Sequence, residues 1–406
     1  TAGSNTAVGH DALKLNTTGG QNNAFGDGTM DSNTTGCRNV AMGNAALGKN
    51  TEGLCNTAIG HIALQCNVTG DNNTAVGACS LHKNTGSSNT AIGRSALEAN
   101  TTAASNTAVG NNSMNCNTTG TENTAVGRYS LYENTEGDGN VALGFCALMC
   151  NTTANSNTAV GVSSLRLNQT GANNVAVGRT ALEKNTTTAN TAVGFASMRC
   201  TTTGGNNAGL GQCALNALTT GSNNMAVGAE ASRKLTTGSD NVSMGRSAML
   251  DATNADGNVA LGNEAVENLT SGSNNTGVGK HSLRNLTTGG NNIGIGVCAG
   301  ADASMINITT ESNRFVAGHN DITNSYVKVD WTVTSDLRDK TEIGDVPVGL
   351  EFVNQMKPVS FKFKKSRENP EPHGFKKYGF LAQDILKLEG SDNVIIDNEN
   401  DENLKV

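Results

Sequence analysis

Aromatic residues are scarce in this chain of 406 residues, where they make up 3% of the composition. Nine of the fourteen lie beyond residue 300, so the first 300 residues have too few for an ordinary globular core. Proline is scarcer still, and Pro347, Pro358, Pro370 and Pro372 all belong to the same C-terminal part. These absences predict two different architectures in one chain, the first of which buries small side chains repetitively.

Clustered positive charge is also missing, because the formal net charge is -7 and the first 300 residues contain no sustained run of Lys or Arg. Nucleic acid is therefore not expected as a partner. No stretch approaches the roughly 18 consecutive apolar residues of a membrane helix, so membrane insertion is not expected either. The chain starts at Thr1 within a repeat, without a signal peptide, so we expect sequence to precede it and make no prediction about export.

Glycine, asparagine and threonine are abundant and recur with a regular period, seen first in the step from Gly9 to Gly26. Eighteen repeats are marked by such a Gly, ending at Gly296, and the step is seventeen positions fifteen times and sixteen positions twice. An Asn lies four residues before each Gly and an apolar residue immediately before it. Leu, Met or Val lies four residues after the Gly in sixteen repeats, with Ser232 and Gly300 as the exceptions.

This period indicates short strands separated by turns. Each repeat is too short for two packed helices, and the Gly-rich, β-branched composition disfavours helix. If each repeat is one turn, equivalent residues stack about 4.8 Å apart and eighteen coils extend roughly 85 Å. The sequence therefore predicts an all-β fold over residues 1–300, a parallel β-solenoid. A thin coil buries little apolar surface, so three chains sharing a core, a homotrimer, are expected.

The Asn before each Gly has two structural interpretations. It can form a ladder of amides bonded between coils, or it can occupy a turn position that tolerates left-handed backbone. The first six predicted ladder residues are Asn5, Asn22, Asn39, Asn56, Asn73 and Asn89.

A second Asn lies seven residues after the Gly in the first eleven repeats, from Asn16 to Asn185. It is replaced from Thr201 onward by residues such as Leu218 and Leu235. We interpret this as a change in cross-section or in a subunit contact near residue 195, because the main period continues.

The unit Asn-Thr-Ala-Val-Gly-x-x-Ala-Leu resembles the head repeats of trimeric autotransporter adhesins over residues 1–300. The resemblance implies a left-handed parallel β-roll within a trimer. Those heads use shorter coils, so the handedness and the trimer geometry do not transfer directly.

All ten cysteines lie in the repeats, and eight of them occur two or six residues after the Gly. Cys66 with Cys79, and Cys200 with Cys213, have the same spacing of thirteen, which suggests disulfides between coils. Small buried thiols would fill these positions equally well. The six histidines lack a ligand spacing, so no metal and no other cofactor is expected.

The period stops after residue 300. Residues 301–334 are predicted to be a β-rich connector, with alternating strand material over 315–331. Residues 335–406 then predict a small α+β domain, with a helix over 349–356 and a strand over 359–363.

The C-terminal part contains a series of motifs: Ser-Asp-x-Arg-x-Lys, a strand region containing Lys-Pro, and Gly, two hydrophobic residues and Ala-Gln-Asp. Their residues are Ser335, Asp336, Arg338, Lys340, Gly379, Gln383 and Asp384. This series resembles the intramolecular chaperone domain of endosialidases and other phage tail spikes, whose pattern has Glu where this chain has Asp384. The family domain normally ends with a long helix, which does not appear before Val406.

The resemblance implies self-cleavage between Thr334 and Ser335. Ser335 would attack the Thr334 carbonyl, and Lys340, if held neutral, would remove the hydroxyl proton. Asp336 and Arg338 are expected to form structural ion pairs. Release of the chaperone would make folding irreversible and give the shaft kinetic stability. The alternative is that Ser335 is an unreactive turn residue.

These features predict a structural fibre at a virion surface, a tail fibre or spike shaft that attaches to a host receptor or glycan, with no external substrate. A bacterial trimeric adhesin is the alternative, and an ice-binding solenoid with regular Thr rows is a minor one. A polysaccharide-degrading spike would require paired acids about 5 to 9.5 Å apart. Acids such as Asp11, Glu52, Glu98 and Glu230 are scattered over several phases of the repeat and form no evident pair.

Overall fold

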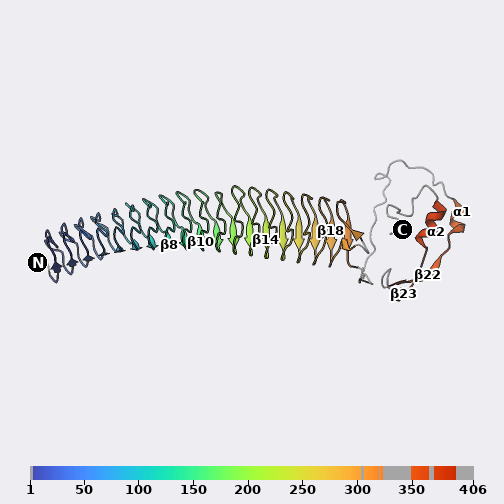
Figure 1. The fold of residues 1–406 in the computed structure, drawn as a ribbon, viewed down its shortest axis with the longest axis horizontal. Coiled ribbons are helices and arrows are strands. Elements are labelled where there is room, and N and C mark those ends of the chain that lie inside the picture. The colour runs from blue at the N-terminus through green and yellow to red at the C-terminus, as the bar shows by residue number, and fades with distance from the viewer. Residues whose placement is uncertain (1–2, 303–305, 320, 323–348, 365–369, 390–406) are drawn as a thin grey trace. The chain divides into compact units, whose positions relative to one another are not determined.

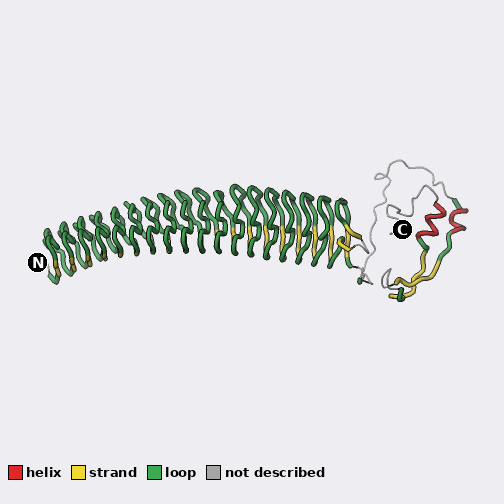
Figure 2. The backbone as a smooth tube through the Cα atoms, viewed as in Figure 1, coloured by secondary structure: helices red, strands yellow, loops and turns green. Residues whose placement is uncertain are grey.

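The computed structural model describes residues 3–302, 306–319, 321–322, 349–364 and 370–389. The chain divides into two compact units, Thr1–His319 and Asn320–Val406. In Figure 1 the coils of the first unit follow one another from the N-terminus to β18. Each coil contains one short strand and loops form the remainder, as can be followed in the last coils in Figure 2. Within the described residues, no helix is long and apolar enough to span a bilayer.

The predicted parallel β-solenoid is confirmed. Eighteen repeat strands, joined by seventeen turns, form one sheet in which each strand pairs in parallel with the equivalent strand of the next coil. The strands are β1 Thr6–Val8, β2 Asn23–Phe25, β3 Val40–Met42, β4 Thr57–Ile59, β5 Thr74–Val76, β6 Thr90–Ile92, β7 Thr107–Val109, β8 Thr124–Val126, β9 Val141–Leu143, β10 Thr158–Val160, β11 Val175–Val177, β12 Thr191–Val193, β13 Ala208–Leu210, β14 Met225–Val227, β15 Val242–Met244, β16 Val259–Leu261, β17 Thr276–Val278 and β18 Ile293–Ile295.

The repeat Gly follows each strand and adopts a backbone conformation that disfavours any side chain. Its φ lies between +120° and +142° in every coil, a region that L-residues rarely adopt. A Cβ on Gly144 would also lie 2.7 Å from the carbonyl carbon and oxygen of Gly161 in the next coil. Two residues after Gly144, Cys146 begins a turn in which Cys146 and Leu148 both have φ near +50°. Hydrogen bonds between coils stabilise this turn, such as the one from the Leu148 amide to the Ser164 carbonyl at 3.0 Å.

The interior is formed by small residues and one or two large apolar residues per coil. Residues alternate across a strand, so the middle residue, such as Ala142, points inward and is fully buried. Ala147 and Leu148 in the following turn are also fully buried. At the two exceptional positions, Ser232 is buried, and Gly300 leaves room that Leu283 and Ile308 fill.

The change near residue 195 lies inside the solenoid. Asn185 and Thr201 are fully buried, and so are Leu218 and Leu235, which replace the amides in later coils. The interpretation as a subunit contact is therefore wrong, because this row is covered on both sides of the change. The strand register from β12 to β13 continues without interruption.

The solenoid continues past residue 300. Strand β21 (Phe315–Ala317) pairs in parallel with β18, with Phe315 opposite Ile293, so this last coil is longer than the others. The extra residues accommodate a small antiparallel pair, β19 (Ala301–Asp302) and β20 (Ile306–Asn307). The first compact unit therefore includes part of the segment predicted to be a connector, and residues 323–331 of the strand predicted there lie outside the described residues.

In the second unit, helix α1 (Leu350–Gln355) precedes an antiparallel pair, β22 (Val359–Lys364) and β23 (Pro372–Gly379). Helix α2 (Ala382–Glu389) follows. Phe352 of α1 packs against Ile385 of α2, and both side chains are buried. The predicted helix and strand of this segment are therefore present.

Candidate functional site

The apolar residue before each repeat Gly points outward. It is the third residue of its strand, on the face opposite the buried middle residue, and none of the eighteen side chains is buried. Met42 is 48% exposed, Ile92 41% and Ile295 46%. We call this set the outer apolar column: Val8, Phe25, Met42, Ile59, Val76, Ile92, Val109, Val126, Leu143, Val160, Val177, Val193, Leu210, Val227, Met244, Leu261, Val278 and Ile295.

The outer apolar column is continuous because parallel pairing aligns equivalent residues. Val109 is opposite Val126, and Val126 is opposite Leu143. The first strand residue lies on the same face and is often apolar too, as with the exposed Met225 and Ile293. A contiguous, partly exposed apolar surface that runs through eighteen coils is unusual on a monomer and marks an interaction site.

The Asn before each Gly links neighbouring coils through the main chain. The Asn56 amide N–H donates to the Asn39 side-chain Oδ1 at 2.9 Å, and Asn39 Nδ2 donates to the Gly53 carbonyl at 2.8 Å. Longer bonds between side chains also occur, such as Asn39 Nδ2 to Asn22 Oδ1 at 3.2 Å. Of the six predicted ladder residues, Asn5 is half-buried and the other five are fully buried. The left-handed backbone falls on the residue before this Asn, for example Cys55.

The second Asn row forms the more direct ladder of amides. Asn134 Nδ2 donates to Asn117 Oδ1 at 2.7 Å, and Asn151 Nδ2 donates to Asn134 Oδ1 at 2.7 Å. Each Nδ2 also donates within its own coil, as Asn134 does to the Gly137 carbonyl at 3.0 Å. These rows are therefore structural, because nearly all of their polar atoms bond within the solenoid; among the described residues of the second row, Asn67 Oδ1 has no partner.

The ten cysteines are all free thiols in the structure, so the disulfides suggested by the spacing are not formed. Burial raises the pKa of Cys146, and burial together with the neighbouring Glu133 raises the pKa of Cys150. Both effects favour the thiol over the reactive thiolate.

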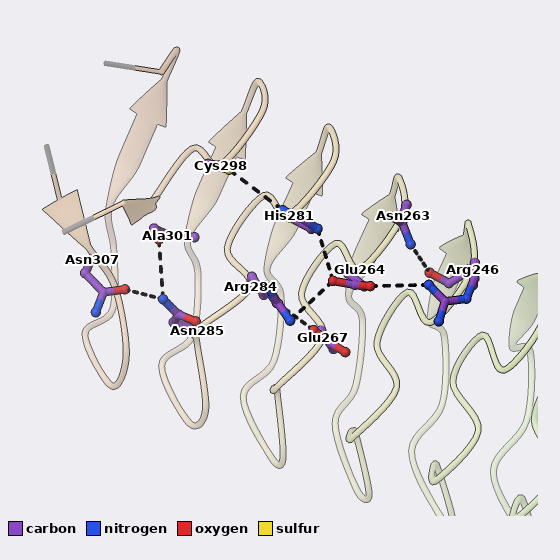
Figure 3. Close-up of polar contacts among 10 residues, drawn as sticks. All are labelled: Arg246, Asn263, Glu264, Glu267, His281, Arg284, Asn285, Cys298, Ala301 and Asn307. Carbon is purple, nitrogen blue, oxygen red and sulfur yellow. Dashed lines mark hydrogen bonds and ion pairs between the residues drawn. The ribbon is translucent and has the colours of Figure 1, made fainter. Parts of the chain in front are cut away.

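A polar network spans the last coils of the solenoid (Figure 3). Glu264 is its centre: its carboxylate lies 3.4 Å from Arg246, 3.3 Å from Arg284 and 3.0 Å from His281 Nε2. Glu267 accepts a 2.6 Å bond from Arg284 Nε, and this bond is the main reason that the pKa of Arg284 is raised.

Cys298 adjoins the same network. Its Sγ lies 3.9 Å from His281 Nδ1 (Figure 3). Glu264, His281 and Cys298 each lie two residues after the repeat Gly in successive coils. Sequence reasoning missed this contact, although the shared position of these three residues in the repeat would have indicated it.

The predicted cleavage residues Ser335 and Lys340, and the neighbouring Asp336 and Arg338, lie outside the described residues. Of the other motif residues, Gly379 ends β23, where a Cβ would meet the Phe361 ring at 3.5 Å. Gln383 and Asp384 lie in the first turn of α2.

Asp384 lies 4.0 Å from Lys387, three residues later on the same helix. Its amide N–H donates to the Leu381 carbonyl at 3.0 Å. The motif around residue 380 therefore connects the end of β23 to the start of α2.

Comparison with known families identifies one match: residues 335–394 match the family described as chaperone of endosialidase. No curated protein is significantly similar to the chain. The match begins at Ser335, the predicted nucleophile, and includes the described elements α1, β22, β23 and α2. Residues 335–394 are therefore recognised as a chaperone-of-endosialidase segment, which follows a parallel β-solenoid in the chain.

Proposed function

We propose that this chain is a structural fibre protein, in which three solenoids assemble side by side through their outer apolar columns. The observation that carries the proposal is the column itself, an unbroken row of apolar residues along one face, each of which is exposed or partly exposed. The chaperone-of-endosialidase match supports the same conclusion, because that family implies assembly of trimers.

The column is large enough for a stable interface. Eighteen side chains, each exposing on the order of 50 Å², give roughly 900 Å² per chain, comparable to the roughly 800 Å² per partner of a standard interface. Their burial contributes on the order of 25 cal/mol per Å² before the costs of association. A single point of contact would bring little, whereas a contact repeated in every coil accumulates along the shaft.

The experiment replaces two adjacent column residues by acids, Val109→Asp with Val126→Asp, in the full chain. Thr102→Asp with Thr119→Asp is the matched control, because it places the same charges one coil apart at exposed positions in another part of the coil. Sedimentation should give a trimer for the wild type and the control. The column variant should remain monomeric, because the interface would bury unpaired charges. A column variant that still forms trimers would contradict the proposed interface.

We also propose that the chaperone segment cleaves itself off before Ser335 once the three chains have assembled. Mass spectrometry of the denatured product, wild type beside Ser335→Ala, tests this step. A wild-type fragment that ends at Thr334, absent from the variant, would support Ser335 as the nucleophile and Lys340 as its base. If both products stay intact, the segment acts at most as a permanent trimerising cap.

We place the fibre at a virion surface, where it would present or extend a surface that binds a host receptor or glycan. The support is the combination of a rod-forming repeat with a chaperone segment of the kind found in phage tail spikes. Immunogold labelling of purified particles with antibodies against the shaft tests this location. The ice-binding alternative has less support, because hydroxyls of one Thr row bond the next coil, as Thr17 Oγ1 does to the Thr34 carbonyl at 3.0 Å.

A further inference from the structure

We propose that Cys298, His281 and Glu264 form a nucleophilic thiol site that reacts with disulfides. The three side chains come from successive coils and make a continuous chain of contacts (Figure 3). Cys298 Sγ lies 3.9 Å from His281 Nδ1, and His281 Nε2 lies 3.0 Å from Glu264 Oε2. Cys298 is only partly buried, which the proposed reaction with an incoming reagent requires.

The contacts favour one tautomer of His281. Glu264 pairs with Arg246 at 3.4 Å and with Arg284 at 3.3 Å, so its carboxylate accepts charge-assisted hydrogen bonds. In the tautomer whose Nε2–H donates to this carboxylate, Nδ1 of His281 carries the free lone pair of the ring. That lone pair faces Cys298 Sγ, and it can take the thiol proton.

The charged groups around the sulfur support the same chemistry. The neighbouring coil provides His281 and Arg284, and the coil before it provides Glu264 and Glu267. The main cause of the raised pKa of Arg284 is its hydrogen bond to Glu267. Cys298 is a smaller cause, so its sulfur lies within electrostatic reach of the Arg284 guanidinium. Two basic groups thus lie near the sulfur, and the two carboxylates bind those bases. The side chains of residues 302–305 lie outside the described residues.

The reaction is thiol–disulfide exchange. The Cys298 proton moves to His281 Nδ1, and the thiolate attacks one sulfur of the incoming disulfide. A bond forms between Cys298 Sγ and that sulfur while the disulfide bond breaks. The leaving thiolate takes the proton from the imidazolium and departs as a thiol. The products are a mixed disulfide on Cys298 and one free thiol, and no other oxidant is needed.

Cys213 provides a matched control within the same molecule. It lies two residues after its repeat Gly, as Cys298 does, and it is also partly buried. The preceding coil places Ala196 where the Cys298 site has His281. The two thiols therefore differ in the base beside them, while their backbone position is the same, with φ +54° for both.

The experiment treats the full chain briefly with limiting aromatic disulfide, quenches with acid and measures modification of each cysteine by mass spectrometry. At about pH 6 Cys298 should react roughly fivefold to tenfold faster than Cys213, because an ordinary thiol is almost wholly protonated there. The ratio should fall toward one at about pH 9, where an ordinary thiol ionises without help from a neighbouring base. Glu264→Gln should lower the ratio at the lower pH.

His281→Ala should bring the ratio to about one at every pH. The fold should tolerate this change, because Ala196 already occupies the equivalent position. Equal rates for Cys298 and Cys213 in the wild type would overturn the proposal. So would a ratio that His281→Ala leaves unchanged, since the rate difference would then reflect exposure alone.

Discussion

Replacing Gly144 by Ala should disrupt the solenoid locally. Gly144 has φ +138°, and an added Cβ would lie 2.7 Å from the backbone of Gly161. Backbone atoms cannot turn away as a flexible side chain can, so the two coils must separate. The bond from the Gly161 amide to the Leu143 carbonyl, at 2.8 Å, lies beside this contact and would lengthen.

The free-energy cost of Gly144→Ala follows from two effects. An L-residue forced into this backbone region costs about 1–3 kcal/mol. Loss of one hydrogen bond between coils costs about 1 kcal/mol more. We therefore expect local opening to become easier by about 3 kcal/mol, which corresponds to roughly a hundredfold faster amide exchange.

The assay is hydrogen–deuterium exchange with peptide resolution, because the coils of a solenoid open locally and a single global transition is not assured. Gly139→Ala is the matched control: Gly139 has φ +62°, its added Cβ would have its nearest neighbour 4.0 Å away, and Ser156 occupies the equivalent position one coil later. This control should cost about 1 kcal/mol or less. If Gly144→Ala exchanges no faster than Gly139→Ala around β9 and β10, the stacking argument is wrong.

Three further predictions concern the interior and the last coil. Leu148 is fully buried, so Leu148→Ala should cost about 3 kcal/mol in chemical denaturation, whereas Leu148→Met, a residue found there in other coils, should cost less than about 1.5 kcal/mol. Asn134→Asp should cost at least about 2 kcal/mol in the same assay, because an ionised carboxylate cannot donate to Asn117 Oδ1 or the Gly137 carbonyl. The Thr309 amide N–H, which donates to Glu311 at 2.7 Å, is the main cause that lowers the pKa of that carboxyl. Its contribution to stability is thus present above the ordinary pKa and is lost as the pH falls through the lowered value. Acid should therefore speed amide exchange over residues 306–314, and Glu311→Gln should remove this pH dependence.

The repeat made the solenoid predictable, because a constant spacing of Gly, Asn and Leu can be satisfied together only by stacked turns. It was harder to predict from the sequence which residues of each strand point into the solenoid and which point outward. Strand alternation alone allows either the middle residue Ala142 or its neighbour Leu143 to be inside. The turn decides between them, since the left-handed backbone at Cys146 and Leu148 goes with an interior that contains both Ala142 and Leu148, while Leu143 is only partly buried.

The two candidate sites also differ in how readily the sequence predicts them. The chaperone segment could be predicted because its motif residues are close in sequence, and the family match begins at Ser335. The Cys298 site depends on contacts between coils. Its residues are ordinary when considered singly, and only the stacking of one coil on the next brings Glu264, His281 and Cys298 together.

The most direct test of the account is electron cryomicroscopy of the purified full chain, viewed in cross-section along the shaft. We predict three parallel solenoids around one axis, with Val109, Val126 and the rest of the outer apolar column facing that axis. Single solenoids, or an assembly that leaves the column facing solvent, would contradict the account.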